Sequence, residues 1–500
     1  MSNRYIVLCV SAFCLSASAL AQDSVATRLS YDLSAEAAIG SGDYTAFQLV
    51  ANRHHTLATR PNTAFLRGAV NISHSLSQDL TLSGAVDGTA SVHADHKAYL
   101  QQCYANLSYK SFFIEAGSRE QRLVVRDNML SVGSFVKGSN AKPIPQVHLG
   151  TSGFWSVPLT RQWVQVNFDF GYGKFLDSGY RDDMFQRAPD VNSFKTTGAY
   201  YHQKHLYIRT NPTKRFFAMV GIEHAVQFGG SKLSIENGVT TEVRKPASLK
   251  AFWEVILPVG DSNYSDNGAM EDWVYGNHIG VMTYQIGWNI DGSHQLQVYL
   301  DNPFEDGSGV RKGNGWDGTW GLQYTNNTSG RQYVRGAVFE YVQTTNQSGP
   351  LHWDPSDYPE PVRSQITDVV TGEDSYYNNN FYDSYAHYGM TPGNPLITSP
   401  IYNQDGFTGF RDNRVRAWHL GVSGELTSRL SYLVKGSYRE GWGTYSAPLP
   451  AKRHSLDAMV QALYAAGPWQ FAAAYAFDKG NIYGDCSTFN FKIGYHGKIL

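Results

Sequence analysis

Long apolar runs are missing from this 500-residue chain once its first 21 residues are set aside. A helix that crosses a membrane needs about 20 consecutive apolar residues, so we do not expect membrane helices in the remainder. Charged residues are also few, at 17%, which is low for the surface of a soluble protein. The formal net charge of −2 gives no electrostatic reason to expect nucleic acid as a partner.

Cysteine is scarce as well, and only Cys103 and Cys486 remain outside the first segment. The sequence leaves open whether these two form a disulfide or stay unpaired, because pairing depends on distances in the folded chain. His202 and His205 are three residues apart on a predicted strand, so they project to opposite faces and do not make a pair of metal ligands. We therefore expect neither a metal nor a cofactor.

The first 21 residues form a separate element. Arg4 precedes the apolar stretch Tyr5–Leu15, and the small residues Ala19 and Ala21 come just before Gln22. This order is typical of a secretory signal peptide over residues 1–21, which leaves 22–500 as the mature protein. The sequence therefore predicts an exported protein.

Aromatic residues are abundant and lie in alternating segments. They make up 14% of the chain, and tyrosine, with 32, is the commonest of them. Within 163–174, Phe168 and Phe170 share one face while Asn167 and Asp169 share the other, so one face suits lipid and the other suits water. Strands of this kind are typical of outer-membrane β-barrels with a polar lumen.

Segments of this type recur about eighteen times, and the connections between them alternate in length. Short ones such as Asp291-Gly292 fit periplasmic turns, whereas the longest, the loop insertions 229–277 and 344–413, fit loops that face outside. The sequence predicts an all-β fold, a transmembrane antiparallel β-barrel of about eighteen strands in the cell outer membrane. A secreted all-β domain would also alternate, but it does not explain the short-long rhythm.

One long connection contains a predicted helix that ends before Pro258. Its apolar residues recur at helical spacing, at Leu249, Phe252, Trp253, Ile256 and Leu257. This apolar stripe must be buried against something. We expect it to pack over or into the barrel mouth as part of a plug, or against neighbouring loops.

The segment 374–396, DSYYNNNFYDSYAHYGMTPGNPL, fits neither the strand nor the helix period and is predicted to be a loop. Its aromatic content argues against disorder, and long ordered loops are usually functional. Tyrosine rings stack on the apolar faces of sugars, and amide groups bond to sugar hydroxyls. We interpret this segment as a recognition surface for carbohydrate.

Several motifs give the chain a family resemblance. These motifs follow one another along most of the predicted mature chain: GSREQ at 117–121, YHQKHLYIR at 201–209, GIEHAVQFGG at 221–230, NPFEDGSG at 302–309 and YYNNNFYDSYAHYGMTPGNPL at 376–396. With them the chain resembles the Wzi family of capsule-assembly outer-membrane proteins. The first predicted strand leaves no room for the periplasmic helical bundle that some members carry. The resemblance implies a lectin-like barrel that binds capsular or other surface polysaccharide and supports capsule assembly or attachment.

The candidate polysaccharide contacts lie on two predicted loops. The alternative role of these residues is structural, to hold the two loops over the barrel mouth. They are Tyr376, Tyr377, Asn378, Asn379, Tyr382, Tyr385 and Tyr388 on the first, and Phe304, Glu305, Asp306 and Trp316 on the second. The other expected partners are outer-membrane lipid and lipopolysaccharide, and we expect a monomer. A diffusion porin for sugars or small solutes is the alternative function.

Catalysis is not expected. Glu305 and Asp306 are adjacent, whereas glycosidases draw their two carboxylates from separate elements. Most of the basic residues on or beside strands, a set that includes Lys204 and Arg119, are expected to face the lumen, because a charge that faces lipid is costly. We expect most of them to pair with carboxylates inside the barrel, at Glu115, Glu120, Glu223, Glu340 and Glu440. Binding of an acidic polysaccharide at the outer rim is the alternative role for them.

Overall fold

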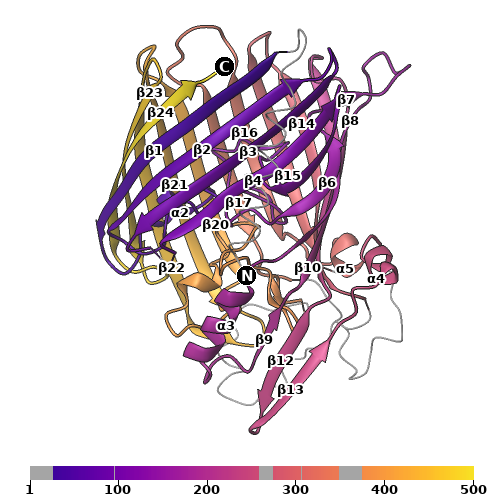
Figure 1. Cartoon of the computed structure of the whole chain (residues 1–500), viewed down its shortest axis with the longest axis vertical. Helices are drawn as coiled ribbons and strands as arrows, with labels where there is room; N and C mark the ends of the chain where they lie inside the picture. The colour runs from indigo at the N-terminus through magenta and orange to yellow at the C-terminus, as the bar shows by residue number, and fades with distance from the viewer. Residues whose placement is uncertain (1–25, 95, 258–273, 306, 348–373) are drawn as a thin grey trace.

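A closed barrel forms the body of the protein (Figure 1). The computed structural model describes residues 26–94, 96–257, 274–305, 307–347 and 374–500, so the predicted signal segment 1–21 lies outside the described residues. Eighteen antiparallel strands pair in chain order, and β1 pairs with β24 to close the wall. The predicted fold class and strand number are confirmed.

The strands of the wall are β1 (Thr27–Ser41), β2 (Thr63–Ser75), β3 (Leu80–Val92), β4 (Ala98–Tyr109), β5 (Phe112–Ser118), β6 (Gln146–Thr151), β8 (Gln165–Lys174), β10 (Tyr200–Arg209), β11 (Phe216–Phe228), β14 (Asn277–Asn289), β15 (His294–Phe304), β16 (Gly318–Asn326), β17 (Gly336–Gln343), β20 (Val415–Glu425), β21 (Leu430–Gly443), β22 (Pro448–Ala466), β23 (Trp469–Gly480) and β24 (Cys486–Lys498). The two-residue strand β7 (Trp155–Ser156) pairs with β8.

The two ends of the barrel differ. One, called here the short-turn end, carries tight turns and the C-terminus, where the Leu29 N–H donates to the Leu500 carbonyl at 3.2 Å. The other, the long-loop end, lies at the bottom of Figure 1. It carries the elements α2 (Phe47–Val50), α3 (Ser178–Arg187), β9 (Phe194–Thr197), β12 (Ser231–Glu236), β13 (Val239–Arg244), α4 (Leu249–Glu254), α5 (Gly307–Val310), β18 (Asn378–Asn379), β19 (Asp383–Ser384) and η4 (Pro400–Tyr402).

The wall separates an apolar outer face from a polar inner face. On β8, Asn167 and Asp169 are buried in the lumen, while Phe168 and Phe170 alternate with them on the outer face. The outer faces of neighbouring strands carry exposed apolar side chains such as Val220. This is the division that a barrel in lipid requires. No helix within the described parts of the chain is long and apolar enough to cross a membrane.

The long-loop half of the lumen is filled by three connections, 42–62, 119–145 and 374–414, which we call the plug. Phe135 of the second packs with Tyr376 and Tyr377 of the third, against Ile279 on the inner face of β14. A second cluster joins Phe47 of the first connection to residues of the other two. The plug therefore has an apolar core of its own, continuous with the inner face of the wall.

Carboxylates of the wall hold the plug in place. Glu340 of β17 accepts from the Ser131 hydroxyl and the Val132 N–H, both at 2.7 Å, and from the Tyr299 hydroxyl at 2.5 Å. Glu223 of β11 accepts from the Ser134 hydroxyl. The prediction that these two glutamates pair with basic residues is wrong, since hydroxyl groups of the plug and of wall tyrosines, together with a plug backbone N–H, donate to them instead.

Other lumenal pairs are of the predicted kind. Arg119 pairs with Glu115 at 2.6 Å, and Arg67, which we did not single out, pairs with Glu120 at 2.7 Å. No disulfide joins Cys103 and Cys486, so the predicted alternative with such a bond does not form.

The predicted helix forms, but its position differs from the prediction. α4 packs against the outer face of β8, β10 and β11, where the Tyr172 hydroxyl donates to the Phe252 carbonyl at 2.6 Å. Ala251 and Val255 are its buried residues, while Leu249, Trp253 and Leu257 of the predicted stripe are exposed. Lys204 also faces outward, toward the Ile256 carbonyl, so it is an exception to the predicted lumenal position of most basic residues.

Replacing Glu340 with alanine should loosen the plug without opening the wall. Ser131, Val132 and Tyr299 would lose a buried acceptor, and each unsatisfied group costs about 1–3 kcal/mol. We expect hydrogen exchange over residues 130–136 to accelerate by about tenfold or more, with heat-modifiable gel migration retained. Glu425→Ala, which removes a half-exposed partner of Arg335, is the matched control and should leave this exchange unchanged. Equal exchange in both variants would contradict the role of Glu340 as an anchor.

Candidate functional site

The tyrosines of the 374–396 segment are buried. Tyr376, Tyr377 and Tyr385 are 0% exposed, and Tyr382 is 1% exposed. The interpretation of this segment as an exposed recognition loop is therefore wrong for these four residues, which have no surface to offer a ligand in this structure. The physical reason is that large rings release the most free energy when removed from water, and the lumen gives them a place to pack.

The hydroxyl groups of Tyr377 and Tyr385 bond within the protein. Tyr377 donates to the Phe135 carbonyl, and Tyr385 donates to the Val136 carbonyl at 2.8 Å. Both acceptors belong to plug connection 119–145. These tyrosines therefore tie two plug connections together, which is the structural role that the sequence left as the alternative.

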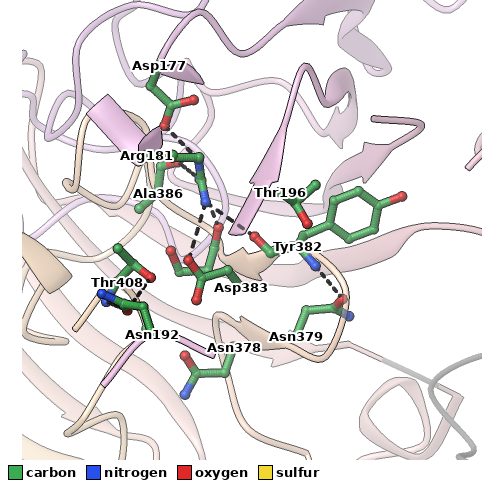
Figure 2. Close-up of polar contacts among 12 residues, drawn as sticks. Asp177, Arg181, Asn192, Thr196, Asn378, Asn379, Tyr382, Asp383, Ala386 and Thr408 are labelled. Atoms are coloured by element: carbon green, nitrogen blue, oxygen red, sulfur yellow. Dashed lines mark hydrogen bonds and ion pairs between the residues drawn. The ribbon is translucent and has the colours of Figure 1, made fainter. Parts of the chain in front are cut away.

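Arg181 of α3 fixes the middle of the segment (Figure 2). Its buried guanidinium donates to the Ala386 carbonyl at 2.9 Å and the Tyr382 carbonyl at 3.3 Å. It also pairs with Asp177 at 3.1 Å and lies 3.6 Å from Asp383. A guanidinium with five donors can satisfy carbonyls and carboxylates at once, so α3 clamps this segment over the barrel.

The two asparagines satisfy backbone groups. Asn379 accepts from the Phe381 N–H at 2.9 Å and from the Tyr382 N–H at 3.0 Å. Asn378 accepts from the Phe410 N–H at 2.7 Å and donates to the Phe410 carbonyl at 2.9 Å. Figure 2 shows both residues beside the Arg181 cluster. Their amide groups shape the turn, as asparagine side chains commonly do.

The second predicted loop contacts the first at Glu305, but its aromatic residues Phe304 and Trp316 lie on the outer side of the wall. Phe304 is buried and stacks on His224, at 6.2 Å between centroids, on the outer side of the wall. Glu305 accepts from the Tyr377 N–H at 2.9 Å. Trp316 is 67% exposed and packs beside Trp320 of β16 at 5.2 Å. Asp306 lies outside the described residues.

Tyr388 is the predicted contact that the structure brings to a pocket, which we call the rim pocket. It is half-buried at the long-loop end with Tyr180 of α3, Tyr99 of β4, His96 and Lys142. The Lys142 ammonium lies 3.7 Å from the centroid of the Tyr99 ring and 5.1 Å from that of Tyr388. The pocket thus combines aromatic faces with a cation.

The rim pocket is shallow. Its volume is about 30 Å³, far below the volume of pockets that enclose whole small molecules. A sugar ring would therefore have to lie across it, stacked on the tyrosine faces. At its base, burial lowers the pKa of His55 to about 3, which keeps that imidazole neutral at pH 7. Lys142 then supplies positive charge at the rim.

Sequence analysis missed most of this pocket. Tyr99, Tyr180, His96 and Lys142 come from three different connections and one strand, and none carries a local motif. Only the closed barrel places them together. Within the described residues, no group of three or more His, Cys, Asp or Glu side chains could hold a metal ion.

Comparisons with known proteins place the fold. No protein-family model and no curated protein matches the sequence. Among solved structures the chain is similar to Escherichia coli Wzi, described as an outer-membrane protein involved in group 1 capsule assembly and a carbohydrate-binding β-barrel. The TM-score is 0.55 at 10% identity, over 97% of this chain and 87% of that one.

Porins are similar at a lower level. Pseudomonas aeruginosa OccK5 has a TM-score of 0.48 at 10% identity, over 95% of this chain and 98% of that one. Pseudomonas aeruginosa OprD has a TM-score of 0.42 at 9% identity, over 95% and 96%. At such identities the likeness to Wzi shows the outer-membrane barrel fold alone.

Arg181→Ala should release the clamped segment. The change leaves Asp177 and Asp383 as buried carboxylates without their cation, and breaking a buried pair in this way typically costs about 3–5 kcal/mol. We expect faster hydrogen exchange and faster proteolysis within 382–386. Arg187→Ala, which removes an exposed pair with Asp183 on the same helix, is the control and should have little effect. Unchanged exchange in Arg181→Ala would contradict the clamp.

Asp317, next to Trp316 in the chain, has a raised pKa, whereas that of the exposed Asp291 is lowered. Asp317 is fully buried and accepts from the backbone N–H groups of Asn346 and Gln347, at 3.0 and 2.8 Å. Burial raises its pKa to about 7. In the short turn before β15, Asp291 accepts from the N–H groups of Ser293 and His294, and these bonds lower its pKa.

Asp317→Asn should therefore change the pH dependence of unfolding. Because the folded-state pKa is raised, the stability linked to Asp317 is fully present below about pH 4 and is lost as the pH rises through about 7. Asparagine cannot ionise, so the variant should gain on wild type between about pH 4 and pH 8, by at most about 4 kcal/mol. Urea unfolding in detergent micelles measures this. Asp291→Asn should show the opposite sign, and parallel curves for Asp317→Asn and wild type would contradict the assignment.

Proposed function

We propose that this protein is a lectin-like barrel of the outer membrane that binds capsular or other surface polysaccharide at its long-loop end, and that it supports capsule assembly or attachment. Export through a signal peptide over residues 1–21 and a monomeric state belong to the same proposal. It is not proposed as an enzyme.

The rim pocket is the observation that carries this proposal. Tyr99, Tyr180 and Tyr388 present half-buried rings at the end where the long loops close the barrel, and aromatic faces stack on sugar rings. Lys142 adds a donor and a positive charge, which suits a sugar that carries a carboxylate. The shallowness of the pocket favours a polymer that lies across the rim over a small molecule that enters it.

The packed plug supports the same conclusion. Among the described residues, its apolar clusters occupy the long-loop half of the lumen and narrow the path of a solute toward the short-turn end. A barrel narrowed in this way is better suited to holding a ligand at its surface than to passing one through. The carbohydrate binding described for Escherichia coli Wzi is consistent with this use of the fold.

Binding of the organism's own surface polysaccharide tests the proposal. We expect Tyr99→Ala with Tyr180→Ala to weaken binding by about tenfold or more, since stacking contributes about 1 kcal/mol or more for each ring. Tyr284→Ala, on the exposed outer wall, is the matched control and should bind as wild type does. Each variant must keep heat-modifiable gel migration. Normal binding by the double variant would remove the rim pocket from the proposal, and no binding by wild type would end the lectin interpretation.

A diffusion porin is the second candidate, because the short-turn half of the lumen is hollow. Arg209, Gln285 and Gln323 line one cavity of about 280 Å³, and Arg67 and Lys492 line another of about 280 Å³. Planar-bilayer conductance separates the two functions. We expect little or no stable conductance from wild type and larger, fluctuating currents from Glu340→Ala, whose plug is loosened. Stable open channels in wild type would favour the porin.

A further inference from the structure

A patch of polar side chains lies on the outer face of the wall near the long-loop end. Strand alternation places His202 and Lys204 of β10, His224 of β11 and His278 of β14 on this face. The His224 and His278 rings lie 5.0 Å apart and bond through their ring nitrogens at 3.0 Å. Polar and charged groups on this face of a barrel are unfavourable when they meet lipid.

α4 and the residues that follow it cover the His202 and Lys204 side of this patch through Tyr172 and Ile256, and Phe304 of β15 stacks on His224. His202, His224 and His278 are buried, and the Lys204 ammonium donates to the Ile256 carbonyl. The Phe252 ring packs 5.0 Å from Phe228, on the same outer face. The connection between β11 and β14 therefore folds back over the outside of the wall and seals the polar groups against it.

The opposite side of α4 is apolar and exposed. Leu249, Trp253 and Leu257 are 84%, 75% and 64% exposed. Their spacing of four residues places them on one side of the helix and the turn after it, away from the buried Ala251 and Val255. Three large apolar side chains in a row are an unfavourable arrangement in water.

This exposed side is continuous with the lipid-facing band of the wall. Ile256 contacts Lys204 of β10. Leu206, the next residue on the same face of β10, is an exposed apolar residue of the lipid-facing band. Its neighbour across the ladder, Ile222, is exposed as well. The apolar side of α4 thus begins where the outer band ends, at the level where tryptophan is enriched in membrane proteins.

We propose that α4 is an interfacial helix that lies in the boundary of the outer leaflet. Leu249, Trp253 and Leu257 face the lipid chains, and the opposite side of the helix shields the histidine and lysine patch from them. Lys250, paired with Glu254 at 3.2 Å, stays on the headgroup side. The partner of this surface is membrane lipid. This inference goes beyond the proposed polysaccharide site, since it requires the barrel to be in a membrane but not to bind sugar.

Site-directed spin labelling of the full chain in liposomes tests the proposal. A nitroxide is attached at Trp253→Cys, and in a second variant at Leu249→Cys, with Cys103→Ser and Cys486→Ala to remove the native thiols. Accessibility to oxygen, which concentrates in lipid, is compared with accessibility to a water-soluble nickel chelate. Val220→Cys on the outer wall is the lipid control, and Val239→Cys on the β12–β13 hairpin is the water control.

We expect positions 253 and 249 to resemble position 220, with an oxygen-to-nickel ratio several-fold above that of position 239. Ratios like that of position 239 would place α4 in water and overturn the proposal. Low accessibility to both reagents would mean that protein covers the helix, from this chain or a second copy, and would overturn it too. Unchanged heat-modifiable migration confirms that each labelled barrel is folded.

Discussion

The structure depends on carboxylates that the wall turns into its own lumen. Glu223, Glu340 and Asp478 are buried there, and a buried carboxylate is strongly unfavourable without donors. The plug supplies those donors: Ser134 for Glu223, Ser131 and Val132 for Glu340, and the Phe47 N–H for Asp478. Wall and plug therefore complete each other, and neither satisfies its buried polar groups alone.

This dependence decides where recognition can occur. Since two plug connections meet through Tyr377 and Tyr385, most of the tyrosine-rich segment forms core. Arg181 then fixes the same segment from α3. What remains available to a ligand is the edge of this packed body, where Tyr388 emerges beside Tyr99. A rigid edge of this kind holds aromatic rings in place with little loss of conformational freedom on binding.

Polar groups on the outer face of the wall are also covered by a long connection. On the inside, buried polar groups are satisfied by the plug. On the outside, the histidines and Lys204 near the long-loop end are buried beneath the α4 connection and Phe304. The plug and the α4 connection both fold back onto the wall, the plug inside the lumen and the α4 connection over the outer face. Long connections in this barrel thus cover polar groups of the wall on both of its faces.

The sequence by itself determined the barrel and its number of strands, because strand alternation and turn length are local. It also placed a helix close to α4 and put His202 and His205 on opposite faces. Only the tertiary structure decided which connections enter the lumen. The same tyrosines suit an exposed sugar platform and a buried core, and the choice rests on contacts such as Tyr377 with Phe135, 242 residues apart. Local pattern carries no information about such a distance, so the rim pocket and the outward position of α4 emerge only when the wall closes.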